Sequence, residues 1–130
     1  GKNATVFAYG LSVARAAKAA EALETEGISV RVCDMFTIKP LDRQAVVDAA
    51  RRTGAIVTVE EHSIIGGLGS AVAEVLAEEG IAVPFTRVGI RDCFTESGSY
   101  DQLVEHFGIG ASAIEEAVRA VVKKKGGSVL

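Results

Sequence analysis

The chain has 130 residues, of which 48% are hydrophobic and 24% are charged, and its formal net charge is −3. These values are typical of a soluble globular domain and exclude an intrinsically disordered chain, which would be less hydrophobic. The negative net charge also excludes the basic footprint of a nucleic-acid-binding domain. The length fits one domain, which we expect to cover residues 1–125, with a flexible tail at 126–130.

The cysteines and the hydropathy indicate a cytoplasmic protein without a membrane anchor. Cys33 and Cys93 are far apart in the sequence and match no metal-ligand or redox spacing. No apolar run reaches the roughly 18 residues of a membrane span, and no signal segment begins the chain. The chain starts at Gly1 and enters a strand pattern almost at once. This start suggests a domain cut from a longer protein or a processed chain.

Strand and helix patterns alternate along the first half of the chain. Residues 4–9 form an apolar strand pattern, and a helix with one apolar face is predicted over about residues 10–26. The strand predicted at 28–33 alternates apolar and polar side chains, which indicates a position near the edge of the sheet. The next helix is predicted to start with Asp42 as its N-terminal cap and to end at Gly54.

The second half continues this alternation. An apolar, β-branched strand is predicted at 55–59, followed by a glycine cluster that opens a third helix. A fourth strand is predicted at 83–90. Capping-box spacings at Ser99 and Ser112 predict two more helices, and the basic run at 123–125 is interpreted as a solvated helix end. The whole pattern predicts an α/β fold with helices on both faces of a mainly parallel sheet.

Polar residues and glycines gather after the strand at 55–59. In chain order they are Glu60, Glu61, His62, Gly66, Gly67 and Gly69. Open α/β sheets place their ligand or partner sites at the carboxyl edge of the strands. The polar loop at 91–98, which contains Arg91 and Asp92, lies at the same edge if the third and fourth strands are parallel. This edge is therefore the candidate site.

The glycines match part of a dinucleotide-binding pattern. The third glycine of that fingerprint falls on Val72, and no acidic residue lies near position 87 to hold a ribose. Glu60 and Glu61 would also repel a phosphate. Close approach between this helix and another backbone is the better interpretation of the glycines.

Two other catalytic patterns are incomplete. The segment at 10–14 resembles a nucleophile elbow around Ser12. Asp34 and then either His62 or His106 follow it in the required order. A serine near a helix start is more often a cap, and hydrolases of that architecture need a larger sheet. No second histidine or cysteine stands at ligand spacing from His62, so the residues alone offer no complete catalytic or metal site.

Three longer motifs occur in order along the chain. They are T-I-K-P-L-D at 37–42, V-E-E-H-S-I-I-G-G-L-G-S-A-V-A-E at 59–74 and G-I-R-D-C-F-T-E-S-G-S at 89–99. Together they resemble the C-terminal domain of the transketolase-like thiamine diphosphate enzymes, over about residues 4–122. That family includes deoxyxylulose-phosphate synthases and the β subunits of 2-oxo acid dehydrogenases. The second motif is most similar to transketolase.

The resemblance implies a three-layer α/β/α domain with a mixed, mostly parallel sheet whose first strand is antiparallel to the others. In this family, thiamine diphosphate and its divalent metal lie between the two preceding domains, and the metal-binding motif begins Gly-Asp-Gly. That motif is absent from this chain. The catalytic glutamate also belongs to the middle domain. The resemblance therefore implies that this chain binds neither cofactor nor metal, and that Glu60 and Glu61 are not catalytic.

The resemblance also implies a function in assembly. We expect the C-terminal domain or subunit of a transketolase, inactive alone, which packs on the pyrimidine-binding domain and supports a homodimer that transfers two-carbon ketol units between sugar phosphates. One alternative is a partner-docking domain of a 2-oxo acid dehydrogenase β subunit or a deoxyxylulose-phosphate synthase. Another is a regulatory anion site at the same edge. The expected contacts with a neighbouring domain or an anion are Glu61, His62, Gly66, Gly67, Gly69, Arg91 and Asp92.

Overall fold

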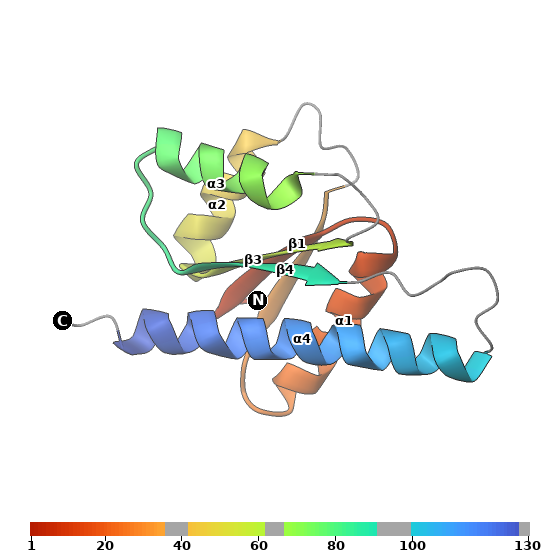
Figure 1. Cartoon of the computed structure of the whole chain (residues 1–130). Helices are drawn as coiled ribbons and strands as arrows, with labels where there is room; N and C mark the ends of the chain where they lie inside the picture. The colour runs from red at the N-terminus through yellow and green to blue at the C-terminus, as the bar shows by residue number, and fades with distance from the viewer. Residues whose placement is uncertain (36–41, 62–66, 91–99, 128–130) are drawn as a thin grey trace.

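The computed structural model describes residues 1–35, 42–61, 67–90 and 100–127. Strands and helices alternate through these ranges, as the sequence predicts (Figure 1). The elements are β1 (Ala4–Ala8), α1 (Leu11–Glu24), β2 (Val30–Asp34), α2 (Arg43–Thr53), β3 (Ile56–Glu61), α3 (Leu68–Glu78), β4 (Phe85–Ile90) and α4 (Tyr100–Gly127).

The four described strands form one sheet in the order β2-β1-β3-β4, and each neighbouring pair is parallel. β2 lies at an edge, as its alternating pattern predicts. The expected antiparallel first strand is wrong, because Thr5 of β1 is paired in parallel register with Arg31 of β2 and with Ile56 of β3. The physical reason is α1, which carries the chain back by about 21 Å before β2 begins, whereas an antiparallel neighbour needs only a short hairpin.

Helices cover both faces of this sheet, so the three-layer α/β/α arrangement is confirmed. α2 and α3 lie on one face and α1 and α4 on the other (Figure 1). Alternate strand residues supply the two cores: Val57 and Val59 pack toward α1 and α4, whereas Phe7 and Ile56 pack toward α2 and α3. All four side chains are fully buried. Burial on both faces explains why the central strands are nearly continuous apolar runs.

The ends of α2 follow the sequence prediction closely. The Asp42 carboxylate accepts a hydrogen bond from the backbone N–H of Ala45 at 3.1 Å, which caps the N-terminus. At the other end, Gly54 has a φ of 68°, in the left-handed region, and its N–H donates to the Ala50 carbonyl at 3.0 Å. The two local signals therefore place the start and the end of this helix correctly.

The C-terminal part of the chain differs from the prediction. A single helix, α4, runs from Tyr100 to Gly127, so the separate helix predicted to start at Ser112 is wrong. Ala111, Ile114 and Val118 continue one buried stripe through this point, and their packing favours an unbroken helix over a local cap. Ser99 lies outside the described residues. The helix also extends two residues into the segment 126–130 that the sequence predicts to be a tail.

Lys125 joins the end of α4 to the amino edge of the sheet. Its Nζ atom donates hydrogen bonds to the carbonyl of Asn3 at 2.8 Å and to the carbonyl of Thr53 at 2.6 Å. The interpretation of 123–125 as a solvated helix end is therefore wrong for Lys125, which is partly buried, whereas Lys123 and Lys124 are exposed. The sequence gives no sign of this contact because its partners are 122 and 72 residues away.

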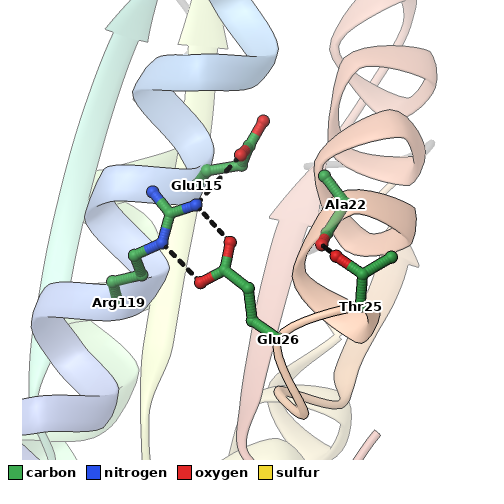
Figure 2. Close-up of polar contacts among 5 residues, drawn as sticks. All are labelled: Ala22, Thr25, Glu26, Glu115 and Arg119. Carbon is green, nitrogen blue, oxygen red and sulfur yellow. Dashed lines mark hydrogen bonds and ion pairs between the residues drawn. The ribbon is translucent and has the colours of Figure 1, made fainter.

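An ion pair joins α4 to the turn after α1 (Figure 2). Arg119 donates from Nε to Glu26 Oε1 at 2.9 Å and from Nη2 to Glu26 Oε2, and Nη2 also lies 3.2 Å from Glu115 Oε1. The hydrogen bonds from Arg119 hold the pKa of the Glu26 carboxyl below its usual value, and Glu26 raises the pKa of Arg119. In the same turn, Thr25 Oγ1 donates to the Ala22 carbonyl at 2.6 Å.

Candidate functional site

The candidate site is the carboxyl edge of β3 and β4. Glu60 and Glu61 are the last two residues of β3, where they pair with Gly89 and Ile90 of β4. Parallel pairing of these two strands confirms that β3 and β4 both end at the same edge of the sheet. Of the predicted contact residues, the structure describes Glu61, Gly67 and Gly69. For Glu61 it describes the backbone alone. The others, His62, Gly66, Arg91 and Asp92, lie outside the described residues.

Glu60 caps the first turn of α3. Its Oε1 atom accepts a hydrogen bond from the N–H of Leu68 at 2.8 Å, and Oε2 accepts one from the N–H of Gly69 at 3.1 Å. The amide groups at a helix N-terminus and the helix dipole favour negative charge at this position. The carboxylate of Glu60 therefore holds two of the donors that a bound phosphate would use.

Sequence reasoning missed this role of Glu60. A local capping box places the two partners three residues apart, whereas Glu60 is eight and nine residues before the amides it binds. The available signal was a glutamate at the end of a strand followed by glycines at a helix start. That signal becomes specific only when the strand and the helix are placed beside each other.

Gly67 and Gly69 have different structural reasons to be glycine. Gly67 precedes α3 with a φ of 65°, a left-handed conformation that residues with a Cβ rarely adopt. Gly69 is buried, and a Cβ there would lie 2.7 Å from Nε and 3.0 Å from Cγ of Arg87 in β4. The predicted close approach to another backbone is therefore wrong for Gly69, because its near neighbour is a side chain.

The residues around Ser12 do not form a nucleophile elbow. Ser12 is only 1% exposed, and its Oγ has no hydrogen-bond partner among the described residues. Gly10 occupies the cap position of α1, where no side chain accepts a capping hydrogen bond. The interpretation of Ser12 as a helix cap is therefore wrong, and the burial of its hydroxyl also opposes a role as an exposed nucleophile.

Cys33 lies on the edge strand β2 and is half-buried. Burial raises the pKa of its thiol, and the positive charge of Arg31 opposes this shift only in part. A raised pKa lowers the fraction of thiolate, which is the reactive and metal-binding form. Cys33 therefore lacks the properties of an activated nucleophile. Cys93 lies outside the described residues.

The described residues do not fit a thiamine diphosphate or metal site. In the part of the chain that the structure describes, no group of three or more His, Cys, Asp or Glu side chains is arranged to hold a metal ion. The amides at the start of α3 already bind Glu60 rather than a diphosphate. Over the same described ranges, no helix is long and apolar enough to cross a membrane.

Comparison with known proteins identifies the family. The family model described as "Transketolase, C-terminal domain" matches residues 1–114. The chain is 48% identical over 125 residues to the 6-deoxy-6-sulfo-D-fructose transketolase subunit SqwH of Clostridium sp. strain MSTE9, covering 96% of this chain and 38% of that protein. It is 40% identical to a putative transketolase C-terminal section of Methanocaldococcus jannaschii, covering 96% of this chain and 39% of that section.

Two further matches extend this result. A 1-deoxy-D-xylulose-5-phosphate synthase of Syntrophotalea carbinolica is 46% identical over 119 residues, which are 92% of this chain and 19% of that enzyme. A solved structure titled "Split gene transketolase, inactive beta4 tetramer" superposes with a TM-score of 0.78 at 50% identity, covering 95% of this chain and 40% of the other. The chain thus spans well under half the length of these relatives. With the parallel α/β fold and the family match over most of its length, the chain belongs to the transketolase C-terminal domain family.

Proposed function

We propose that this chain supports the assembly of a transketolase and has no active site of its own. The parent enzyme transfers two-carbon ketol units between sugar phosphates, with thiamine diphosphate and a divalent metal held by its other sections. The observation that carries this proposal is the likeness to the split-gene transketolase structure, whose title calls its tetramer inactive. The capped start of α3 supports it, because the amides that face the carboxyl edge are bound within the chain.

The proposed contact with the neighbouring domain is the carboxyl edge of β3 and β4. Its candidate residues remain Glu61, His62, Gly66, Gly67, Gly69, Arg91 and Asp92. Because Glu60 neutralises the start of α3, this edge offers polar groups and close packing rather than a cofactor cradle. We expect the assembled enzyme to be a homodimer of the complete catalytic unit.

The direct test of inactivity uses the isolated chain. We expect no ketol transfer with a ketose phosphate donor and an aldose phosphate acceptor, and no calorimetric heat on titration with thiamine diphosphate and Mg²⁺. The physical reason is that the described residues contain no group of three or more metal-ligand side chains, and that Glu60 already binds the amides of Leu68 and Gly69. Turnover, or tight cofactor binding by this chain alone, would refute the proposal.

A deoxyxylulose-phosphate synthase is the second candidate parent, because one such enzyme is 46% identical to this chain. The two parents differ in their donor substrate. A complex of this chain with its complementary section should accept a ketose phosphate donor if the parent is a transketolase. Release of CO₂ from a 2-oxo acid donor would instead favour the synthase, and capture of an acyltransferase core in a pull-down would favour a 2-oxo acid dehydrogenase.

A regulatory anion at the start of α3 is less favoured than a domain contact. Such an anion would have to displace Glu60 from the amides of Leu68 and Gly69. We expect calorimetric titration of the chain with sugar phosphates to give no heat. Binding that becomes tighter in Glu60→Gln would show that the amides can accept an external anion and would revive this alternative.

A further inference from the structure

The amino edge of the sheet brings three distant chain segments together. Lys125, near the end of α4, donates to the carbonyl of Asn3 at 2.8 Å and to that of Thr53, the last residue of α2, at 2.6 Å. Figure 1 shows this end of α4 on the side of the sheet from which the strands start. The edge lies opposite the carboxyl edge that contains Glu60 and α3's first turn.

Exposed cations surround this junction. Each is within two residues in sequence of Asn3, Thr53 or Lys125, and together they form what we name the basic cluster: Lys2, Arg51, Arg52, Lys123 and Lys124. All five side chains are exposed. None of them forms an ion pair with another residue in the described part of the chain, where the cations of the ion pairs are Arg43 and Arg119.

A general preference for cations at helix C-termini does not explain the basic cluster, because only some helices of this chain follow it. The last turns of α2 and α4 contain basic residues, but those of α1 and α3 contain none. α1 ends at Glu24 and α3 at Glu78. The basic helix ends are therefore the two that Lys125 joins. The five cations flank a junction that the Lys125 hydrogen bonds fix, so the cluster is a local source of positive charge on a chain whose net charge is −3.

We propose that the basic cluster binds an acidic segment of a protein partner. A row of carboxylates on a short segment can pair with the cations of α2 and α4 at once, because Lys125 fixes the two helix ends beside each other. Nucleic acid fits less well. Glu21 and Glu24 are exposed in the last turns of α1, which ends just before the edge strand β2 begins, and they would repel a long polyanion that extends past the cluster.

The test measures binding of a fluorescently labelled hexaglutamate peptide to the full chain by anisotropy. We expect binding at about 20 mM salt that weakens strongly at about 150 mM salt, since the cluster is exposed to solvent. Arg52→Glu and, separately, Lys124→Glu should each weaken it by about tenfold. Lys18→Glu is the matched control, because it makes the same charge change at an exposed site on α1 and should alter binding by less than about twofold.

Circular dichroism melting curves would establish that all three variants are folded. No hexaglutamate binding at low salt, or an equal loss in the Lys18→Glu control, would overturn the proposal. Tighter binding of a thymidine hexanucleotide than of hexaglutamate would also overturn it, in favour of a nucleic acid. The inference does not depend on the proposed function, because the ketol-transfer assays measure turnover whereas anisotropy measures peptide binding at the amino edge, so each can fail without the other.

Discussion

Glu60 connects the end of β3 to the start of α3 through two amide hydrogen bonds, to Leu68 at 2.8 Å and Gly69 at 3.1 Å. A charged acceptor at a helix N-terminus is stabilised by the helix dipole as well as by its hydrogen bonds. The same residue therefore contributes to stability and prevents an external anion from binding these amides. The capping of α3 therefore explains why Glu60 lies at the carboxyl edge of the sheet.

Replacing this carboxylate should destabilise the domain. We expect Glu60→Gln to lower the free energy of unfolding by about 1 kcal/mol, because the amide side chain keeps one acceptor and loses the charge. Urea denaturation followed by circular dichroism measures the change. Glu74→Gln is the control, since Glu74 is exposed in the middle of α3. Equal stability of the two variants would contradict the capping role.

Gly67 offers a second test at the residue scale. Its φ of 65° predicts that Gly67→Ala lowers the free energy of unfolding by about 1 kcal/mol, because a Cβ is strained in the left-handed region. Asparagine tolerates this conformation better, so Gly67→Asn should cost clearly less. Among the described residues, no atom outside its chain neighbours would lie within 4 Å of a Cβ at Gly67, so contact with them would not obscure the comparison. Thermal melting of the two variants tests this order.

At the scale of elements, α4 is held at two points along one side of the sheet. The Arg119 ion pair connects it to the turn after α1, and Lys125 connects it to Asn3, the residue before β1, and to the end of α2. The buried stripe of Ala111, Ile114 and Val118 precedes both contacts and passes through Ser112. The packing of this stripe explains why the helix continues through a position that has a local start signal.

The ion pair between Glu26 and Arg119 predicts a pH dependence. The pKa of Glu26 is lower in the folded chain than its ordinary value of 4.5, so its stabilisation is present above pH 4.5 and is lost as the pH falls through the folded pKa. The difference in unfolding free energy between the unmodified chain and Glu26→Gln should therefore shrink below about pH 4.5. Urea denaturation from pH 7 to pH 3 measures it.

Glu24→Gln is the control for this pH series, because Glu24 is an exposed residue of α1 that forms no ion pair with the described residues. Its difference from the unmodified chain should stay small over the same range. A Glu26→Gln difference that grows toward low pH would show that the pair does not stabilise the fold.

At the scale of the whole molecule, the sequence predicts the elements better than their contacts. Strand periodicity and glycine stops locate β1, α2 and β3 correctly, because those signals act within a few residues. The contacts of Glu60 and Lys125 depend on segments that the fold brings together, so no local pattern identifies them. The family resemblance implies an antiparallel first strand, and the parallel pairing of β1 with β2 and β3 corrects this expectation.

The candidate site shows the same limit. The sequence places Glu60, Glu61, Gly67 and Gly69 correctly at the carboxyl edge, because the end of a strand and the start of a helix are local features. It does not show that Glu60 binds within the chain or that Arg87 packs over Gly69. The role of Glu61, His62, Arg91 and Asp92 in a domain contact stays a prediction.

We propose that this chain completes a transketolase without contributing catalytic groups. The most direct measurement is ketol transfer by the complementary section, assayed with and without this chain. We predict that neither part turns over substrate alone, that mixing them gives activity, and that His62→Ala in this chain weakens their association more than it lowers its own melting temperature. Full activity of the complementary section alone, or turnover by this chain alone, would contradict the account.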